Sequence, residues 1–263
     1  MNIGRSTMLP SAPSDHIDLD QFRLKVRAAK LAVQKPETTV LRGSPSWTQL
    51  VRAPAIARDA HVDPISAAPQ RVIPNCNACP VERCPARSES AAESWREMMD
   101  LMGPQLPGAA MLMRIGQPLT SLFSVRAGCI KSYTIDAQGN EHVRAFHFPG
   151  DLVGLEALGA QRAHASATPV MPSQVCAVPV AELELRMKQD PKIAGELLRK
   201  AQYDLRQALA LTGEYAADER VAAFLLLVHA RTGGGNVLRL PMTRREIGSY
   251  LRLATETVCR MLT

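Results

Sequence analysis

Residues 240–262 read LPMTRREIGSYLRLATETVCRML, and this stretch decides how the C-terminal part of the chain folds. Thr243 and Glu246 have the spacing of a capping box, in which a hydroxyl and a carboxylate each bind a backbone N–H at the start of a helix. Apolar residues follow at helical intervals from Ile247 and predict a buried face. A turn over 252–254 then leads into a second helix, which is the spacing of a helix-turn-helix.

The two helices of this motif carry side chains that can contact DNA. Glu256, Cys259 and Arg260 recur at helical offsets, so they share one face. Arg can bind guanine bidentately and Glu can accept a hydrogen bond from cytosine, whereas Arg side chains elsewhere suit phosphates. An ordinary amphipathic helix pair with solvated charges is the alternative reading of the motif alone. The candidate DNA-contacting residues are Glu256, Cys259, Arg260, Thr243, Arg244 and Arg245, with Arg252 as a further phosphate contact.

Upstream of this motif the pattern is first that of strands and then that of helices. Residues 110–186 alternate apolar and polar side chains, which predicts about seven or eight short antiparallel strands, and DAQGN at 136–140 is a hairpin signal. A helical period from 190 to 217 predicts one long helix. We favour a dimer-forming role for it over packing within its own domain alone. A second helix is expected over 218–230, followed by a short strand over 237–242.

Composition limits the classes of protein that the chain can belong to. Its 263 residues carry a net charge of +6, which by itself indicates no nucleic-acid partner. No apolar run is long enough for a membrane span, and the N-terminus lacks the apolar stretch of a signal peptide, so a cytoplasmic protein is expected. Residues 1–74 are rich in Pro and Ala, and we expect a largely disordered extension with one candidate helix over 17–34.

The six cysteines of the chain indicate metal or redox chemistry, because structural disulfides are rare in a reducing compartment. Cys76, Cys79 and Cys84 form a C-x2-C-x4-C pattern on a Pro-containing loop. Thiolates suit both iron–sulfur clusters and zinc, so these residues alone support the two equally. No Gly-rich phosphate loop, pair of catalytic acids or Ser/His/Asp set is found in the sequence, so an enzyme is not expected.

Five stretches of the chain together match a known family. They are IKSYTI (130–135), FHFPGDLVG (146–154), VCAVP (175–179), ERVAAF (219–224) and LPMTRREIGSYLRLATETVCRML (240–262). On these residues the sequence resembles the Crp-Fnr superfamily of bacterial transcription regulators, and within it the oxygen-sensing FNR type, from about residue 75 onward.

The resemblance implies an α+β fold. It consists of an antiparallel β-roll like that of cyclic-nucleotide-binding domains, a long dimerisation helix, and a C-terminal winged helix-turn-helix. We therefore divide the chain into the extension (1–74), the cysteine loop plus β-roll sensor (75–189), the dimerisation helix (190–217) and the DNA-binding domain (218–263). The sequence stops at Thr263, inside the second helix of the motif, so we expect the wing to be missing from a fragment or a truncated protein.

The resemblance also implies a set of ligands. Cys76, Cys79 and Cys84 stand where the family has its first three cluster ligands, although the second gap is slightly shorter here. Cys176, in VCAVP, stands at the fourth position, so a 4Fe–4S cluster is expected, with zinc as the alternative. Cys129 lies where the family has no ligand, and we interpret it as a buried packing residue.

The activity and partners that the resemblance implies are those of an activator of anaerobic metabolism. We expect an oxygen-labile cluster to control dimerisation and binding to half-sites of the TTGAT type, with Cys259 in place of the family's Ser. DNA, RNA polymerase and a second copy of the chain are the expected partners, and the hairpin around 136–141 resembles the surface presented to the polymerase. Cyclic nucleotide is not expected, because 163–176 lacks an Arg for its phosphate and only Arg162 is near. The alternative is a cluster- or zinc-bearing module without DNA-binding activity in this form.

Overall fold

The computed structural model describes residues 75–76, 79–87, 91–101, 106–108, 110–212, 215–232 and 238–262. All of them belong to the second of the two units into which the chain divides, Pro54–Thr263. The expectations for residues 1–74 lie outside the described residues. No helix in the described part of the chain is long and apolar enough to cross a membrane.

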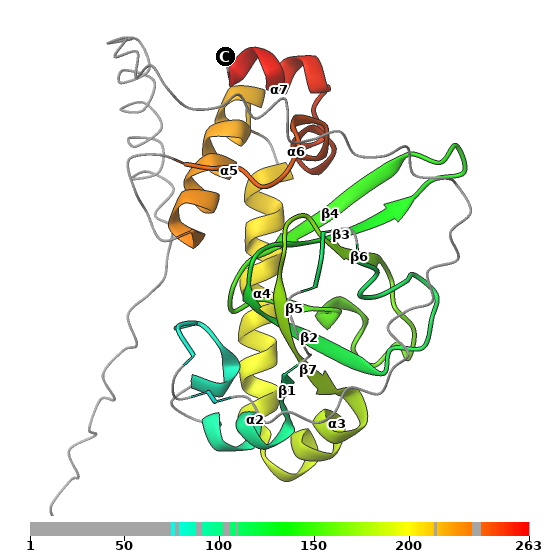
Figure 1. Cartoon of the computed structure of the whole chain (residues 1–263), viewed down its shortest axis with the longest axis vertical. Coiled ribbons are helices and arrows are strands. Elements are labelled where there is room, and N and C mark those ends of the chain that lie inside the picture. Colours follow the sequence, from blue (N-terminus) through cyan, green and yellow to red (C-terminus); the bar gives the residue numbers. More distant parts are fainter. Residues whose placement is uncertain are drawn as a thin grey trace, which may run out of the picture. The chain divides into compact units, whose positions relative to one another are not determined.

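Seven strands and six α-helices are found in the described ranges, with two short 3-10 helices (Figure 1). The strands are β1 (Asp100–Leu101), β2 (Ser121–Ala127), β3 (Ile130–Ile135), β4 (Glu141–His147), β5 (Leu152–Val153), β6 (Ser166–Pro169) and β7 (Gln174–Pro179). The helices are α2 (Ala92–Met98), α3 (Val180–Gln189), α4 (Pro191–Thr212), α5 (Ala217–Arg231), α6 (Arg244–Leu251), α7 (Thr255–Met261), η2 (Pro85–Arg87) and η3 (Leu155–Ala157).

The strands form two antiparallel sheets, with the orders β1-β7-β2-β5 and β4-β3-β6, so the predicted antiparallel β-roll is confirmed. The predicted hairpin joins β3 to β4. In its turn the Asp136 carboxylate accepts hydrogen bonds from the backbone N–H groups of Gln138 and Asn140, each at 2.9 Å. Gly139 takes φ 83°, a left-handed conformation that glycine adopts without strain.

Two local predictions are wrong. The all-β region does not reach residue 186, because β7 ends at Pro179 and α3 begins at Val180. The segment VAELELRMKQ consists mostly of good helix formers, and Glu182 pairs with Arg186 one turn later at 2.9 Å. The short strand predicted over 237–242 is absent from 238–242. A strand needs a hydrogen-bonded neighbour, and no strand of the described residues pairs with this segment.

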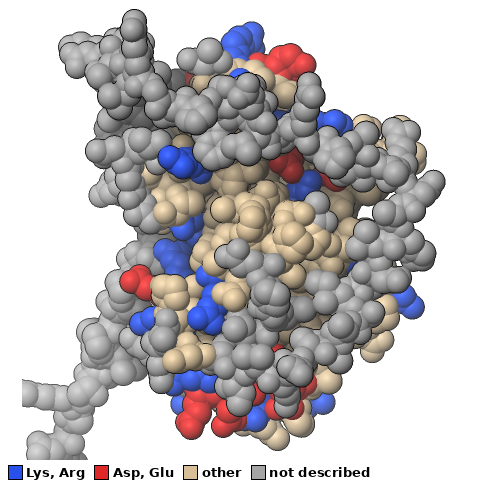
Figure 2. Space-filling view, viewed as in Figure 1, with Lys and Arg blue, Asp and Glu red and all other residues tan. Residues whose placement is uncertain are grey.

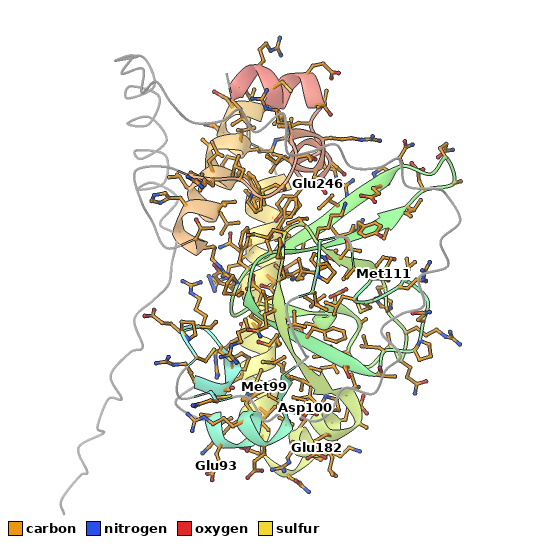
Figure 3. The ribbon with its side chains drawn as sticks, in the orientation of Figure 1. Glu93, Met99, Asp100, Met111, Glu182 and Glu246 are labelled. Carbon is orange, nitrogen blue, oxygen red and sulfur yellow. The ribbon has the colours of Figure 1, made fainter. Side chains whose placement is uncertain are left out.

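The core joins the β-roll to α2, α3 and the first half of α4. Trp95 of α2 is 1 % exposed, and its indole N–H donates to Glu196 of α4 at 2.8 Å. Arg186 of α3 forms an ion pair with Glu97 of α2 at 2.7 Å. Acidic and basic side chains are accordingly intermixed over α2 and α3 in Figure 2, and Figure 3 labels Glu182 there.

Helix α4 has two apolar faces. Ile193 and Leu197 are buried in the core beside the β-roll. Leu198, Leu205 and Leu209 are each about 60 % exposed, and their intervals of seven and four residues place them on one side of the helix. We call these three residues the leucine stripe. Figure 1 shows α4 as a single unbroken helix, which the long helical period predicts.

Candidate cysteine centre and DNA-binding face

Three of the four predicted ligands lie on a tightly folded segment, residues 75–76 and 79–87, which we call the cysteine loop. The backbone N–H of Cys79 donates to the carbonyl of Cys76, and that of Cys84 to Val81, both at 3.3 Å. The Arg87 guanidinium donates to the Cys79 carbonyl at 2.8 Å. All three cysteines are less than a tenth exposed and pack in the core.

The fourth predicted ligand enters from the sheet. Cys176 lies in β7, where it is paired with Ser124 of β2 on one side and Leu101 of β1 on the other. It is 6 % exposed and belongs to the same cluster of buried residues as the cysteine loop. The fold therefore brings the four predicted ligands into one core from two segments that are far apart in the sequence.

The four thiols are close enough to affect one another's ionisation. Burial raises the pKa of Cys176 to about 12, and Cys84, Cys76 and Cys79 add to this increase. Burial also raises the pKa of Cys84, to which Cys79 and Cys76 contribute while a hydrogen bond with Ser124 opposes it. The metal-free thiols of Cys84 and Cys176 are therefore protonated at neutral pH, and a metal that binds them would displace the protons.

The donor set fits a sulfur-preferring group in its chemistry. All four cysteines are free and buried, and soft thiolates suit iron–sulfur clusters and zinc. A single tetrahedral zinc ion, with bonds to sulfur of about 2.3 Å, holds its sulfurs about 3.8 Å apart. Among the described residues no three Cys, His, Asp or Glu side chains are arranged to hold a metal ion.

Cys129 is separate from this group. It is 1 % exposed, and its backbone N–H donates to the Ser173 hydroxyl at 3.1 Å. Burial raises the pKa of its thiol, with contributions from Asp151 and Glu246 and none from another cysteine. The prediction that Cys129 packs in the core is confirmed.

The helix-turn-helix begins as the sequence predicts. The Thr243 hydroxyl accepts from the Glu246 backbone N–H at 3.2 Å, and the Glu246 carboxylate accepts from the Thr243 N–H at 2.7 Å. The turn after α6 depends on two further residues. Arg252 is left-handed, with φ 57°, and a Cβ on Gly248 would lie 2.8 Å from the Leu253 carbonyl oxygen.

The predicted DNA-contacting side chains lie on the two helices of this motif. On α7, Glu256 and Arg260 are exposed and Cys259 is half-buried. Thr243, Arg244, Arg245 and Arg252 are exposed as well. The side chains proposed for base contacts and for phosphate contacts are thus all at least partly accessible.

Sequence reasoning missed Arg220 of α5, which caps the C-terminal end of α6. Its guanidinium donates to the carbonyl of Leu251, the last residue of α6, at 2.8 Å. A cation at this position satisfies an orphan carbonyl and interacts favourably with the helix dipole. The available signal was a charged residue beside the apolar run in ERVAAF.

Sequence reasoning also missed the contact between the β-roll and α6. Lys131 of β3 binds Glu141 of β4 at 2.7 Å and the capping residue Glu246 at 2.9 Å. The Ser249 hydroxyl accepts from the Val143 N–H at 2.9 Å and donates to the Glu141 carbonyl at 3.1 Å. Figure 3 labels Glu246, which faces the sheet from α6.

Two family models match the chain in the regions just described. Residues 105–190 match the cyclic nucleotide-binding domain, and residues 219–263 match the Crp-like helix-turn-helix domain. Among solved structures, FixK2 of Bradyrhizobium japonicum is 30 % identical, with a TM-score of 0.57 over 62 % of this chain and 82 % of that one. A Crp-family regulator of Thermus thermophilus, at 16 % identity, has a TM-score of 0.50 over 61 % and 82 % of the two chains and shows the fold alone.

Curated relatives agree with these models. The transcriptional activator protein Anr of Pseudomonas aeruginosa is 32 % identical over 206 residues, which cover 76 % of this chain and 84 % of the relative. The fumarate and nitrate reduction regulatory protein of Vibrio cholerae is 36 % identical over 158 residues, which cover 57 % and 63 % of the two. The chain therefore belongs to the Crp-Fnr superfamily of transcription regulators, with FNR- and Anr-type relatives, and carries its helix-turn-helix DNA-binding domain.

Proposed function

We propose that this protein is an oxygen- or redox-responsive transcription activator in which Cys76, Cys79, Cys84 and Cys176 hold a 4Fe–4S cluster. The observation that carries the proposal is the joining of these four free thiols in one buried group, with the fifth buried cysteine left outside it. A cluster is larger than one ion, so its ligands stand farther apart than those of zinc. Soft thiolates suit such a cluster, with zinc as the alternative that metal analysis distinguishes.

A bound cluster would supply a link that oxygen can break. Three of its ligands belong to the cysteine loop and the fourth to β7, so the link would tie this loop to the sheet. Without it, only packing and hydrogen bonds hold the loop to the sheet. The state of the cysteines would thereby control how firmly the loop is fixed beside α4.

The leucine stripe supports the proposed homodimer. Three leucines about 60 % exposed on one side of α4 are the kind of surface that a second copy of the same helix covers. A dimer would present two copies of α7 to successive major grooves about one helical turn apart. Glu256 and Arg260 would then read half-sites of the TTGAT type, with Cys259 between them.

Two further parts of the proposal concern what the β-roll binds. The β3–β4 hairpin around 136–141 is proposed as the contact for RNA polymerase. Cyclic nucleotide is not proposed as an effector, and Arg162, the one nearby candidate for its phosphate, donates to the Gly116 carbonyl at 2.8 Å.

The test is anaerobic purification of the protein followed by iron, sulfide and zinc analysis and by absorption spectra before and after exposure to air. We expect about four irons and four sulfides per chain and a broad visible absorption that air removes. Cys176→Ala should lose the iron, whereas the matched variant Cys129→Ala, also a buried cysteine, should keep it. A colourless protein with one zinc per chain would overturn the sensor proposal.

A further inference from the structure

The cysteine loop makes a direct contact with α4 through Arg83, the residue before Cys84. Its guanidinium donates to the Tyr203 hydroxyl at 3.3 Å and lies 5.8 Å from the centre of the Tyr203 ring. The same residue touches the turn before β5. Gly150 has φ 90°, and a Cβ there would lie 2.7 Å from the Arg83 Cβ.

That turn is fixed to the DNA-binding domain by a buried group of charges. Asp151 forms ion pairs with Lys200 of α4 at 2.7 Å and with Arg231, the last residue of α5, at 2.5 Å. The side chains of Asp151 and Arg231 are only 11 % and 6 % exposed. The other carboxylate oxygen of Asp151 accepts from the Phe148 N–H at 2.8 Å.

Tyr203 stands between these two contacts. The Lys200 ammonium lies 5.3 Å from the centre of its ring. Burial lowers the pKa of Arg231, but Asp151 and a hydrogen bond with Tyr203 more than offset this, so the pKa lies above its usual value. Tyr203 therefore contacts Arg83 of the cysteine loop and Lys200, whose ion-pair partner Asp151 also binds Arg231 of the DNA-binding domain.

We infer that Arg83 and Tyr203 are positioning residues that transmit the state of the cysteine loop to the DNA-binding domain through Arg231 and Asp151. The inference rests on the proposed function, in which binding or loss of the cluster changes the state of the cysteine loop. Buried charges without partners are costly, so the ion pairs of Asp151 hold one arrangement. The loop backbone is packed against Gly150, so a displaced loop must move Tyr203, the turn, or both.

The first arm of the test measures coupling in the full chain. Tyr203→Phe removes the hydroxyl and keeps the ring, and Tyr215→Phe is the matched control outside this group. Iron, sulfide and spectrum should be unchanged in both variants. The ratio of DNA affinities between the anaerobic and the air-exposed protein should fall about fivefold or more in Tyr203→Phe only. An unchanged ratio, or an equal loss of affinity in both states, would overturn the inference.

The second arm does not need the cluster. Hydrogen exchange is followed in the metal-free full chain, with amides of β3 as the internal reference for folding. Arg83→Ala should speed exchange at 228–231, the end of α5, by about fivefold or more, whereas Glu82→Gln in the same loop should not. Unchanged exchange at 228–231 would overturn the inference even if the protein binds iron. If the parent protein contains no iron, the proposed function is overturned. The hydrogen-exchange result then decides by itself whether Arg83 links the cysteine loop to the DNA-binding domain.

Discussion

Replacing Arg252 by Gly should stabilise the protein, although the change removes a whole side chain. Arg252 ends α6 in a left-handed conformation with φ 57° and ψ 43°. That conformation costs a residue with a Cβ about 1–2 kcal/mol, which Gly avoids. Gly also loses more conformational freedom on folding, which offsets about 0.4–1 kcal/mol of that gain in stability. The net gain is therefore about 0.5–1 kcal/mol, or about 1–3 °C in Tm for a domain of this size.

Thermal and urea unfolding of the full chain measure this gain. The control is Arg252→Ala, which removes the same side chain and keeps the strained backbone, so its stability should stay within about 0.5 kcal/mol of the parent. Arg252→Gly should be the more stable of the two variants. If it is equal to or less stable than Arg252→Ala, the left-handed backbone at this position stores no strain and the reasoning fails.

Three other changes test the leucine stripe, the helix-turn-helix and the β-roll. Leu205→Glu should weaken dimerisation at least tenfold, as measured by sedimentation. The change places a charge in the interface and removes about 1–2 kcal/mol of hydrophobic burial free energy from each protomer. Leu185→Glu, which lies off the leucine stripe, should leave dimerisation unchanged. Gly248→Ala should cost about 1–3 kcal/mol of stability, because its Cβ would meet a carbonyl oxygen at 2.8 Å. Gly195→Ala, whose nearest neighbour would be 3.6 Å away, should instead gain about 0.5–1 kcal/mol in the same unfolding assay. Burial lowers the pKa of His147. The neutral His147 therefore contributes stability above about pH 6.5, and this contribution is lost as the pH falls toward the lowered pKa. Below about pH 6.5 the Tm of the parent should fall more steeply with decreasing pH than the Tm of His147→Gln. Equal slopes would contradict this.

Local patterns were enough to predict the elements whose structure depends on neighbouring residues. The Thr243–Glu246 capping box, the 136–140 hairpin and the long helical period each act within a few residues, and each is confirmed. The α3 segment was misjudged because its apolar residues follow a strand without an obvious break. Helix propensity and the Glu182–Arg186 pair decide the outcome there.

The contacts between domains could not be read from the sequence. Lys131 and Glu246, or Asp151 and Arg231, are ordinary charged residues until the fold places them together. The four cysteines were assigned through a resemblance, because spacing alone left zinc and a cluster equally supported. Their meeting in one buried group depends on the pairing of β7 with β1 and β2, which no local pattern specifies.

The hydrogen bonds of the Ser249 hydroxyl hold α6 against β4, and they also affect the solubility of the β-roll. It occupies the backbone groups of Glu141 and Val143 on β4, which is an outer strand of its sheet. If α6 leaves the β-roll, those groups become free to pair with a strand from another molecule. An isolated sensor domain cut off before α6 would therefore expose an unpaired strand edge, which the charged side chain of Arg144, next to Val143, would protect only in part.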